Sequence, residues 1–195
     1  AIAAMGLAEV VAALRTHVAV ARVVEMACSR LNSLCRTEGS THAAAEAGAI
    51  EAVVEALRAH PQEGIGKHIA VRGIAVLHSL CLSDDAAGRA RKQRAAAAGA
   101  LEAVVASLRA HVQVSDVQHL GCMALITVCE GDDAAGRARK QRASAAGALE
   151  VVVEAMQAHP QEAEVQADGC EALLCVCGRG ASAAARARRQ RAAQA

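Results

Sequence analysis

The 195-residue sequence contains no Phe, Tyr or Trp. Without aromatic side chains the chain cannot stack bases as single-stranded nucleic-acid binders do, and it cannot build an aromatic cage for a cationic ligand. The core must therefore consist of Ala, Val, Leu, Ile, Met and Cys, which favours closely approached helices. Only 2 prolines occur, and this scarcity also fits a mostly helical chain, because proline breaks helix interiors.

The sequence also has little net charge and no long hydrophobic run. A formal net charge of +1 gives no overall attraction to nucleic acid or to an anionic membrane. No uncharged stretch reaches the roughly 18 residues that a membrane helix needs, so we expect neither a transmembrane segment nor a nucleic-acid partner. The 8 cysteines fit a reduced chain better than a disulfide framework, which is typical of short secreted proteins. The predicted location is intracellular and cytoplasmic.

What the sequence does contain is a repeat. The segment 47–60 returns at 98–111 and at 146–159, with a looser copy at 4–17. A second block ends in a cysteine at positions 35, 81, 129 and 177, so that the copies are 46, 48 and 48 residues apart. A third block, rich in Arg and Lys, occurs at 84–95 and 132–143, with a variant at 186–192. Self-similarity at such a period predicts a stacked repeat protein.

Each repeat is expected to hold three helices. Asp85 and Asp133 precede the basic blocks, where an N-cap starts a helix, and Gly99 and Gly147 then interrupt the chain. Apolar residues recur with helical spacing through 101–108 and again through 117–128. We therefore predict an all-α, right-handed α-solenoid forming one domain, 1–195. Its predicted units are a partial repeat 1–37, repeats 38–83, 84–131 and 132–180, and the first helix of an incomplete repeat at 181–195. This array of about four repeats is expected to be truncated at both ends.

The sequence resembles the armadillo-repeat family. The stretch 99–105, GALEAVV, is similar to the second helix of that repeat, and 121–129, GCMALITVC, is similar to its third helix. The resemblance implies a protein partner bound along a concave groove lined by the third helices. In peptide-binding members an Asn and a Trp on each third helix grip the peptide. The corresponding positions hold Ser33, Ser79, Thr127 and Cys175 for Asn, and Ser29, Ala75, Met123 and Glu171 for Trp.

With both gripping residues absent, we expect a groove ligand to be recognised by charge and by packing against small residues. The charge along the predicted groove runs from mixed and basic near the start of the chain to acidic near its end. The groove residues predicted to bind a partner are Arg22, Glu25, Ser29, Ser33, His68, Arg72, Ser79, Asp116, His119, Met123, Thr127, Glu164, Asp168, Glu171 and Cys175.

The basic blocks are a second candidate site. Stacked at one repeat position, they are expected to form a positive stripe along one edge of the solenoid, suited to an acidic partner surface, an RNA backbone or anionic lipid head groups. The alternative is a solvated first helix that neighbouring Asp residues partly neutralise. The residues of this predicted stripe are Arg89, Arg91, Lys92, Arg94, Arg137, Arg139, Lys140, Arg142, Arg186, Arg188, Arg189 and Arg191.

The cysteines and histidines are predicted to be structural. Most cysteines follow the apolar stripe of a third helix, which favours a role as small core residues. His60, His111 and His159 each follow a second helix, where an imidazole can meet the terminal carbonyls. We therefore expect no catalytic residue, no cofactor and no metal. The predicted function is a non-catalytic protein-interaction scaffold; the alternative is an architectural subunit built permanently into a larger assembly. Such a chain could also stack end to end on a neighbour or continue into further repeats.

Overall fold

A computed structural model describes residues 2–61, 64–178 and 183–195 of the chain. In these residues the chain forms twelve α-helices and one short 3-10 turn, Ile2–Ala4, and no strand. The predicted all-α fold class is confirmed.

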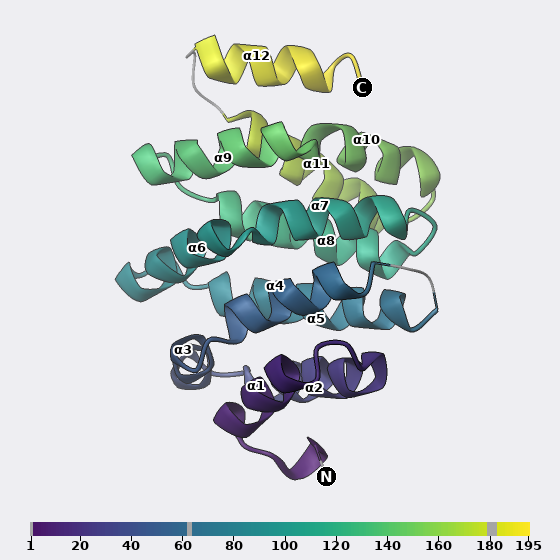
Figure 1. Ribbon diagram of the computed structural model, residues 1–195. Coiled ribbons are helices and arrows are strands. Elements are labelled where there is room, and N and C mark those ends of the chain that lie inside the picture. Colours follow the sequence, from purple (N-terminus) through teal and green to yellow (C-terminus); the bar gives the residue numbers. More distant parts are fainter. Residues whose placement is uncertain (1, 62–63, 179–182) are drawn as a thin grey trace.

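The helices lie in layers that follow one another along the chain (Figure 1). The N-terminal layer has two helices and the next three have three each, while a single helix covers the C-terminal end. In chain order the helices are α1 (Leu7–Thr16), α2 (Ala21–Leu34), α3 (Glu38–Glu46), α4 (Ala49–Ala59), α5 (Ile65–Cys81), α6 (Ala86–Ala98), α7 (Ala100–Ala110), α8 (Ser115–Cys129), α9 (Ala134–Ala146), α10 (Ala148–Ala158), α11 (Ala163–Cys177) and α12 (Ala183–Ala192).

Equivalent helices of successive layers pack against each other. The second helices form the row α1, α4, α7 and α10, and the third helices form the row α2, α5, α8 and α11, each in contact with the next. The first helices are α3, α6, α9 and α12. The two chain ends lie at opposite ends of the stack (Figure 1). A residue that recurs at one repeat position therefore forms a row that crosses the layers.

Local sequence signals set where the helices begin. The carboxylates of Asp85 and Asp133 cap α6 and α9, since each accepts a hydrogen bond of 2.6 Å from a backbone N–H three residues later. Between the first and second helices, Gly99 and Gly147 have φ values of 87° and 94°. Glycine adopts this left-handed conformation without the steric cost that a side chain would impose, so the chain can turn there within one residue.

The core consists of small and medium apolar side chains, as the absence of aromatics requires. Glycines on the third helices allow the second helices to approach closely. A Cβ placed on Gly121 would lie 2.4 Å from Cδ2 of Leu108, and one on Gly169 would lie 2.6 Å from Cγ of Met156. Both distances are below van der Waals contact, so a side chain at either position would have to displace Leu108 or Met156.

The cysteines are free thiols and mostly part of this core. Six of the eight are buried, Cys175 is half-buried and Cys170 is exposed. Burial raises the pKa of the Cys28 thiol to about 12 and that of Cys35 to about 11, because the apolar surroundings disfavour the thiolate. Their placement agrees with the predicted role as small core residues.

Candidate protein-interaction surfaces

The basic blocks lie on the first helices, and the structure assigns different contacts to their four positions. At the first position, Arg89 and Arg137 are exposed. Their Nη1 groups donate to the backbone carbonyls of Asp84 and Asp132, each at 2.5 Å. These arginines therefore close the loop in front of their own helix while remaining at the surface.

At the second position the arginines are buried. Nε of Arg91 donates to O of Leu80 at 2.6 Å, and Nε of Arg139 donates to O of Val128 at 2.6 Å. Arg188 makes the equivalent bond, at 3.2 Å, to Cys177. Each acceptor lies in the last turn of the preceding third helix, where carbonyls lack helical partners and the helix dipole favours a cation. These arginines cap the third helices.

At the third position, Lys92 is the most enclosed cation. Its side chain is 0% exposed, and Nζ lies 2.5 Å from a carboxylate oxygen of Glu130 and 3.2 Å from one of Asp84. The equivalent Lys140 pairs with Asp132 at 2.7 Å. A buried ammonium requires such partners, so these lysines serve the fold.

At the fourth position, arginines bridge successive layers. Arg94 forms a two-pronged pair with Glu51, at 2.6 and 3.0 Å. Burial alone would raise the pKa of Glu51, but the hydrogen bond and the positive charge of Arg94 lower it below its ordinary value. The same pairing recurs one and two layers further along, between Arg142 and Glu102 and between Arg191 and Glu150.

The edge consequently carries fewer available cations than its sequence suggests. Five of the twelve predicted residues are buried, namely Arg91, Lys92, Arg139, Lys140 and Arg188. The arginines at the fourth position are balanced by glutamates. Arg186 and Arg189 are exposed, and Nη1 of Arg189 donates to O of Gly178 at 2.8 Å. A role of the edge in binding a partner stays a prediction, but most of its cations hold the layers together.

Further contacts between layers were missed by the sequence analysis. Nε2 of His60 lies 2.6 Å from O of Val18 in the preceding layer, and Nε2 of His159 lies 2.7 Å from O of Val112. These histidines were expected to meet the carbonyls of their own helix, but they bond to the loop between the second and third helices of the preceding layer. The loop carbonyl of the neighbouring layer comes within reach only once the layers stack.

The row of third helices presents the second candidate surface, which we call the third-helix face. It is the outward side of α2, α5, α8 and α11. Of the fifteen predicted groove residues, only Thr127 is buried, and the other fourteen are exposed or half-buried. The sequence placed these residues on one surface, and the structure brings them together there.

Several side chains on this face connect adjacent third helices. Nδ1 of His119 lies 2.5 Å from Oδ2 of Asp168, linking α8 to α11. Nδ1 of His78 lies 2.8 Å from the Thr127 hydroxyl, linking α5 to α8, and burial lowers the pKa of His78 below its ordinary value. Nδ1 of His68 lies 3.5 Å from Glu25 across α5 and α2.

Other charged side chains of the face have no partner. Among the residues that the structure describes, Arg22 and Arg72 form no hydrogen bond or ion pair, and neither do Glu164 and Glu171. Charges that the fold does not use remain available to another molecule. In this respect the third-helix face differs from the edge formed by the basic blocks.

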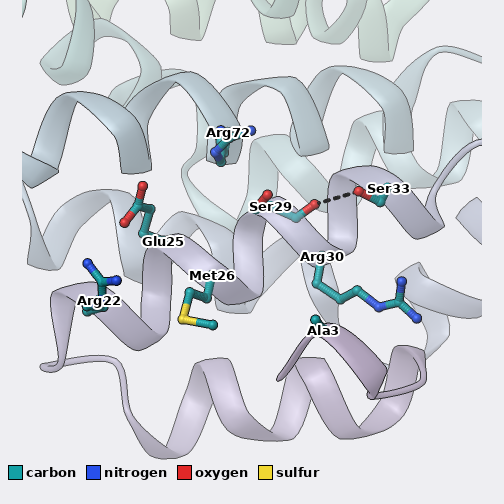
Figure 2. A pocket seen from close by; sticks show the side chains of 8 residues that line it. All are labelled: Ala3, Arg22, Glu25, Met26, Ser29, Arg30, Ser33 and Arg72. Carbon is teal, nitrogen blue, oxygen red and sulfur yellow. Dashed lines mark hydrogen bonds between the residues drawn. The ribbon is translucent and has the colours of Figure 1, made fainter. Parts of the chain in front are cut away.

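The face contains hollows. One hollow has a volume of about 470 Å³. Figure 2 shows the residues that line it, among them Arg22 and Glu25 on α2 and Arg72 on α5. Ser29 and Ser33 line the same hollow, and their short side chains leave its volume open. A second hollow, of about 320 Å³, lies between α5 and α8, and a third, of about 280 Å³, lies against α11. The sequence analysis missed two exposed apolar residues at these hollows, Met26 and Leu174, which are 41% and 60% exposed.

Within residues 2–61, 64–178 and 183–195, no three His, Cys, Asp or Glu side chains converge in a way that could hold a metal ion. Over the same ranges no helix combines the length and apolar character needed to cross a bilayer.

Comparison of the chain with models of protein families, with curated proteins and with solved structures finds no match.

Proposed function

We propose that this chain is a non-catalytic protein-interaction scaffold, and that it binds a partner protein through the third-helix face. We further propose that its layers are armadillo-like repeats of a right-handed α-solenoid. The rows of equivalent helices support this assignment, as does the similarity of 99–105 and 121–129 to the second and third helices of that repeat. In repeat proteins of this kind the stacked layers create an extended binding surface.

The observation that carries the proposal is the contrast between the two charged surfaces. On the edge, cations such as Lys92 and Arg94 are held by carboxylates of the same chain. On the third-helix face, Arg22 and Arg72 have no such partner in the described residues, and they border a hollow. A surface on which most charges are buried or already paired offers less to a ligand, so we assign binding to the third-helix face.

Quantitative affinity purification of tagged protein from its native cells tests the proposal. A face variant, Arg22→Glu with Arg72→Glu, should lose the partners that the wild-type chain retains. An edge variant, Arg89→Glu with Arg137→Glu, changes the net charge equally at exposed positions and should retain them. Circular dichroism must first show that both variants are folded.

The opposite result, with partners lost only from the edge variant, would move binding to the basic blocks. Full retention by both variants would reject the proposal for both surfaces. A chain that aggregates when expressed alone and is recovered only inside one complex would instead favour the architectural subunit.

A further inference from the structure

The charge of the third-helix face changes sign in the middle of the row. Helices α2 and α5 carry four basic residues, Arg22, Arg30, Lys67 and Arg72, against the single acid Glu25. Their net formal charge is therefore +3. Helices α8 and α11 contain no Lys or Arg, and their four acids give a net formal charge of −4. Because α5 packs directly against α8, the two halves meet without an intervening neutral helix.

Most of these charges are not used within the described part of the chain. In the basic half, Lys67 forms no ion pair or hydrogen bond there, and the same is true of Arg22 and Arg72. In the acidic half, Asp116 and Glu164 are exposed and equally unpaired. Exposed charges of one sign attract a ligand of the opposite sign and repel one of the same sign. Each half therefore selects for a different part of a ligand.

We propose that the third-helix face binds an extended protein segment whose acidic half lies over α2 and α5 and whose basic half lies over α8 and α11. This inference rests on the function proposed above and names the kind of partner. The charge reversal fixes the direction of the segment as well as its composition, because a segment placed the other way round would face like charges at both ends.

The dimensions of the face suit a short extended segment. Packed helices lie about 8–10 Å apart, so the four helices of the row span about 24–30 Å between the outer axes. An extended chain advances about 3.3 Å per residue, and about seven to nine residues therefore cross the row. Separate hollows of about 470, 320 and 280 Å³ along the row can receive single side chains of such a segment.

A second copy of the chain, placed antiparallel, would also satisfy the charges, but it suits the face less well. Specific, stable protein interfaces bury about 800 Å² or more on each partner, around a centre depleted of charged residues. Here the two central helices, α5 and α8, carry the charged residues Lys67, Arg72 and Asp116. Self-association is accordingly one of the outcomes that the experiment must distinguish.

Fluorescence anisotropy with labelled synthetic peptides tests the inference. The first probe has about twelve residues, with Glu in one half, Lys in the other and a short Gly-Ser spacer between them. The second has the same composition with Glu and Lys alternating. Exposed charge pairs each change affinity by a factor of about 1.5 to 5, so three or four correctly placed pairs should favour the block peptide about tenfold at about 50 mM salt. The preference should shrink at about 300 mM salt, where exposed charges are screened.

Variants then test each half separately. Arg72→Glu should weaken binding of a peptide that carries only the acidic half, by about fivefold, and leave a peptide with only the basic half unaffected or bound more tightly. Glu171→Lys should have the reverse effect. Arg137→Glu, an equal charge change on the exposed edge, is the matched control and should change neither peptide by more than about twofold. If Arg72→Glu fails to fold, the exposed Arg22→Glu takes its place.

Equal affinity for the block and alternating peptides would overturn the inference, as would equal effects of Arg72→Glu and Arg137→Glu. A dimer in low-salt sedimentation that Arg72→Glu dissociates, together with no peptide preference, would replace the segment with a second copy. If the variant Arg22→Glu with Arg72→Glu still loses its native partners while the block and alternating peptides bind equally well, the proposed function stands. Only the proposed charge pattern of the partner is then wrong. If native partners are retained as well, both fail.

Discussion

Replacing Lys92 tests whether the basic blocks contribute buried contacts that stabilise the fold. The Lys92 side chain is 0% exposed, whereas its partners Asp84 and Glu130 are 68% and 51% exposed. Lys92→Ala removes three buried methylenes, worth about 0.8 kcal/mol each, and two ion pairs with solvated carboxylates, worth up to about 1 kcal/mol together. We expect the free energy of unfolding to fall by about 3 kcal/mol.

Lys92→Met separates the two contributions. The Met side chain replaces the buried stem almost atom for atom and removes only the ammonium group. The carboxylates left behind are exposed to water, so the loss should be about 1 kcal/mol or less. Urea titrations followed by circular dichroism measure both losses. For a chain of this size they correspond to melting temperatures lower by about 10 °C and about 3 °C.

Lys140 is the matched control, because it occupies the same repeat position with a single carboxylate partner, Asp132. Lys140→Met should cost less than Lys92→Met. The reasoning is refuted if Lys92→Ala costs less than about 1 kcal/mol, since the stem would then not be buried. Equal losses for Lys92→Ala and Lys92→Met would show that the charge, and not the stem, carries the contribution.

Three further predictions follow from the packing of the third helices. Gly121→Ala should destabilise the chain by about 1–3 kcal/mol, because the new Cβ would lie 2.4 Å from Leu108. Gly39→Ala, in a helix where nothing lies within 4 Å of the new Cβ, should stabilise the chain by about 0.5–1 kcal/mol. Thermal melts compare the two variants, and a higher melting temperature for Gly121→Ala than for Gly39→Ala would contradict the packing. In native protein, an aromatic disulfide reagent at pH 8 should label the exposed Cys170 in a fast phase, before the buried cysteines. Cys170→Ser should remove that fast phase. Rapid labelling of Cys28 would show that this thiol is not buried. Burial raises the pKa of Cys28 from 9.0 to about 12. The contribution of the neutral thiol to stability is therefore complete below pH 9 and is lost as the pH rises from about 9 towards 12. Urea titrations across that pH range would detect the loss.

The helices could be predicted from the sequence because their signals are local and repeated. The Gly-containing turn at Gly99, the Asp cap at Asp85 and the apolar spacing of 101–108 each act within a few residues. Repetition at intervals of 46–48 residues then indicated that the units stack, since equivalent signals recur along the whole chain.

The roles of the basic residues could not be read from local sequence, because most of their partners lie far away along the chain, several of them in another layer. Arg94 is paired with Glu51, 43 residues earlier, and Lys92 with Glu130, 38 residues later. Composition shows a cluster of cations and does not show which carboxylates meet it in space. One signal was present: Glu51, Glu102 and Glu150 share a repeat position, as do the arginines that bind them. Two charges of opposite sign that recur in step are candidates for a row of ion pairs.

The location of the third-helix face could be predicted from the sequence, but not all of the residues that line it. Its residues could be named because helical spacing defines one side of each third helix. Lys67 and Arg30 were missed, although both line hollows of the face. They lie near the margins of the helical stripe, where only the packing of neighbouring helices decides which side chains reach the surface.

The most direct test of the central claim is site-specific photo-crosslinking in native cells. A photoreactive residue would replace Ser33, which is exposed on the third-helix face, or Ala90, which is exposed on the edge formed by the basic blocks. We predict that a partner protein is covalently captured from position 33 and not from position 90. Capture from position 90 alone would contradict the claim that the third-helix face, and not the basic edge, is the binding surface.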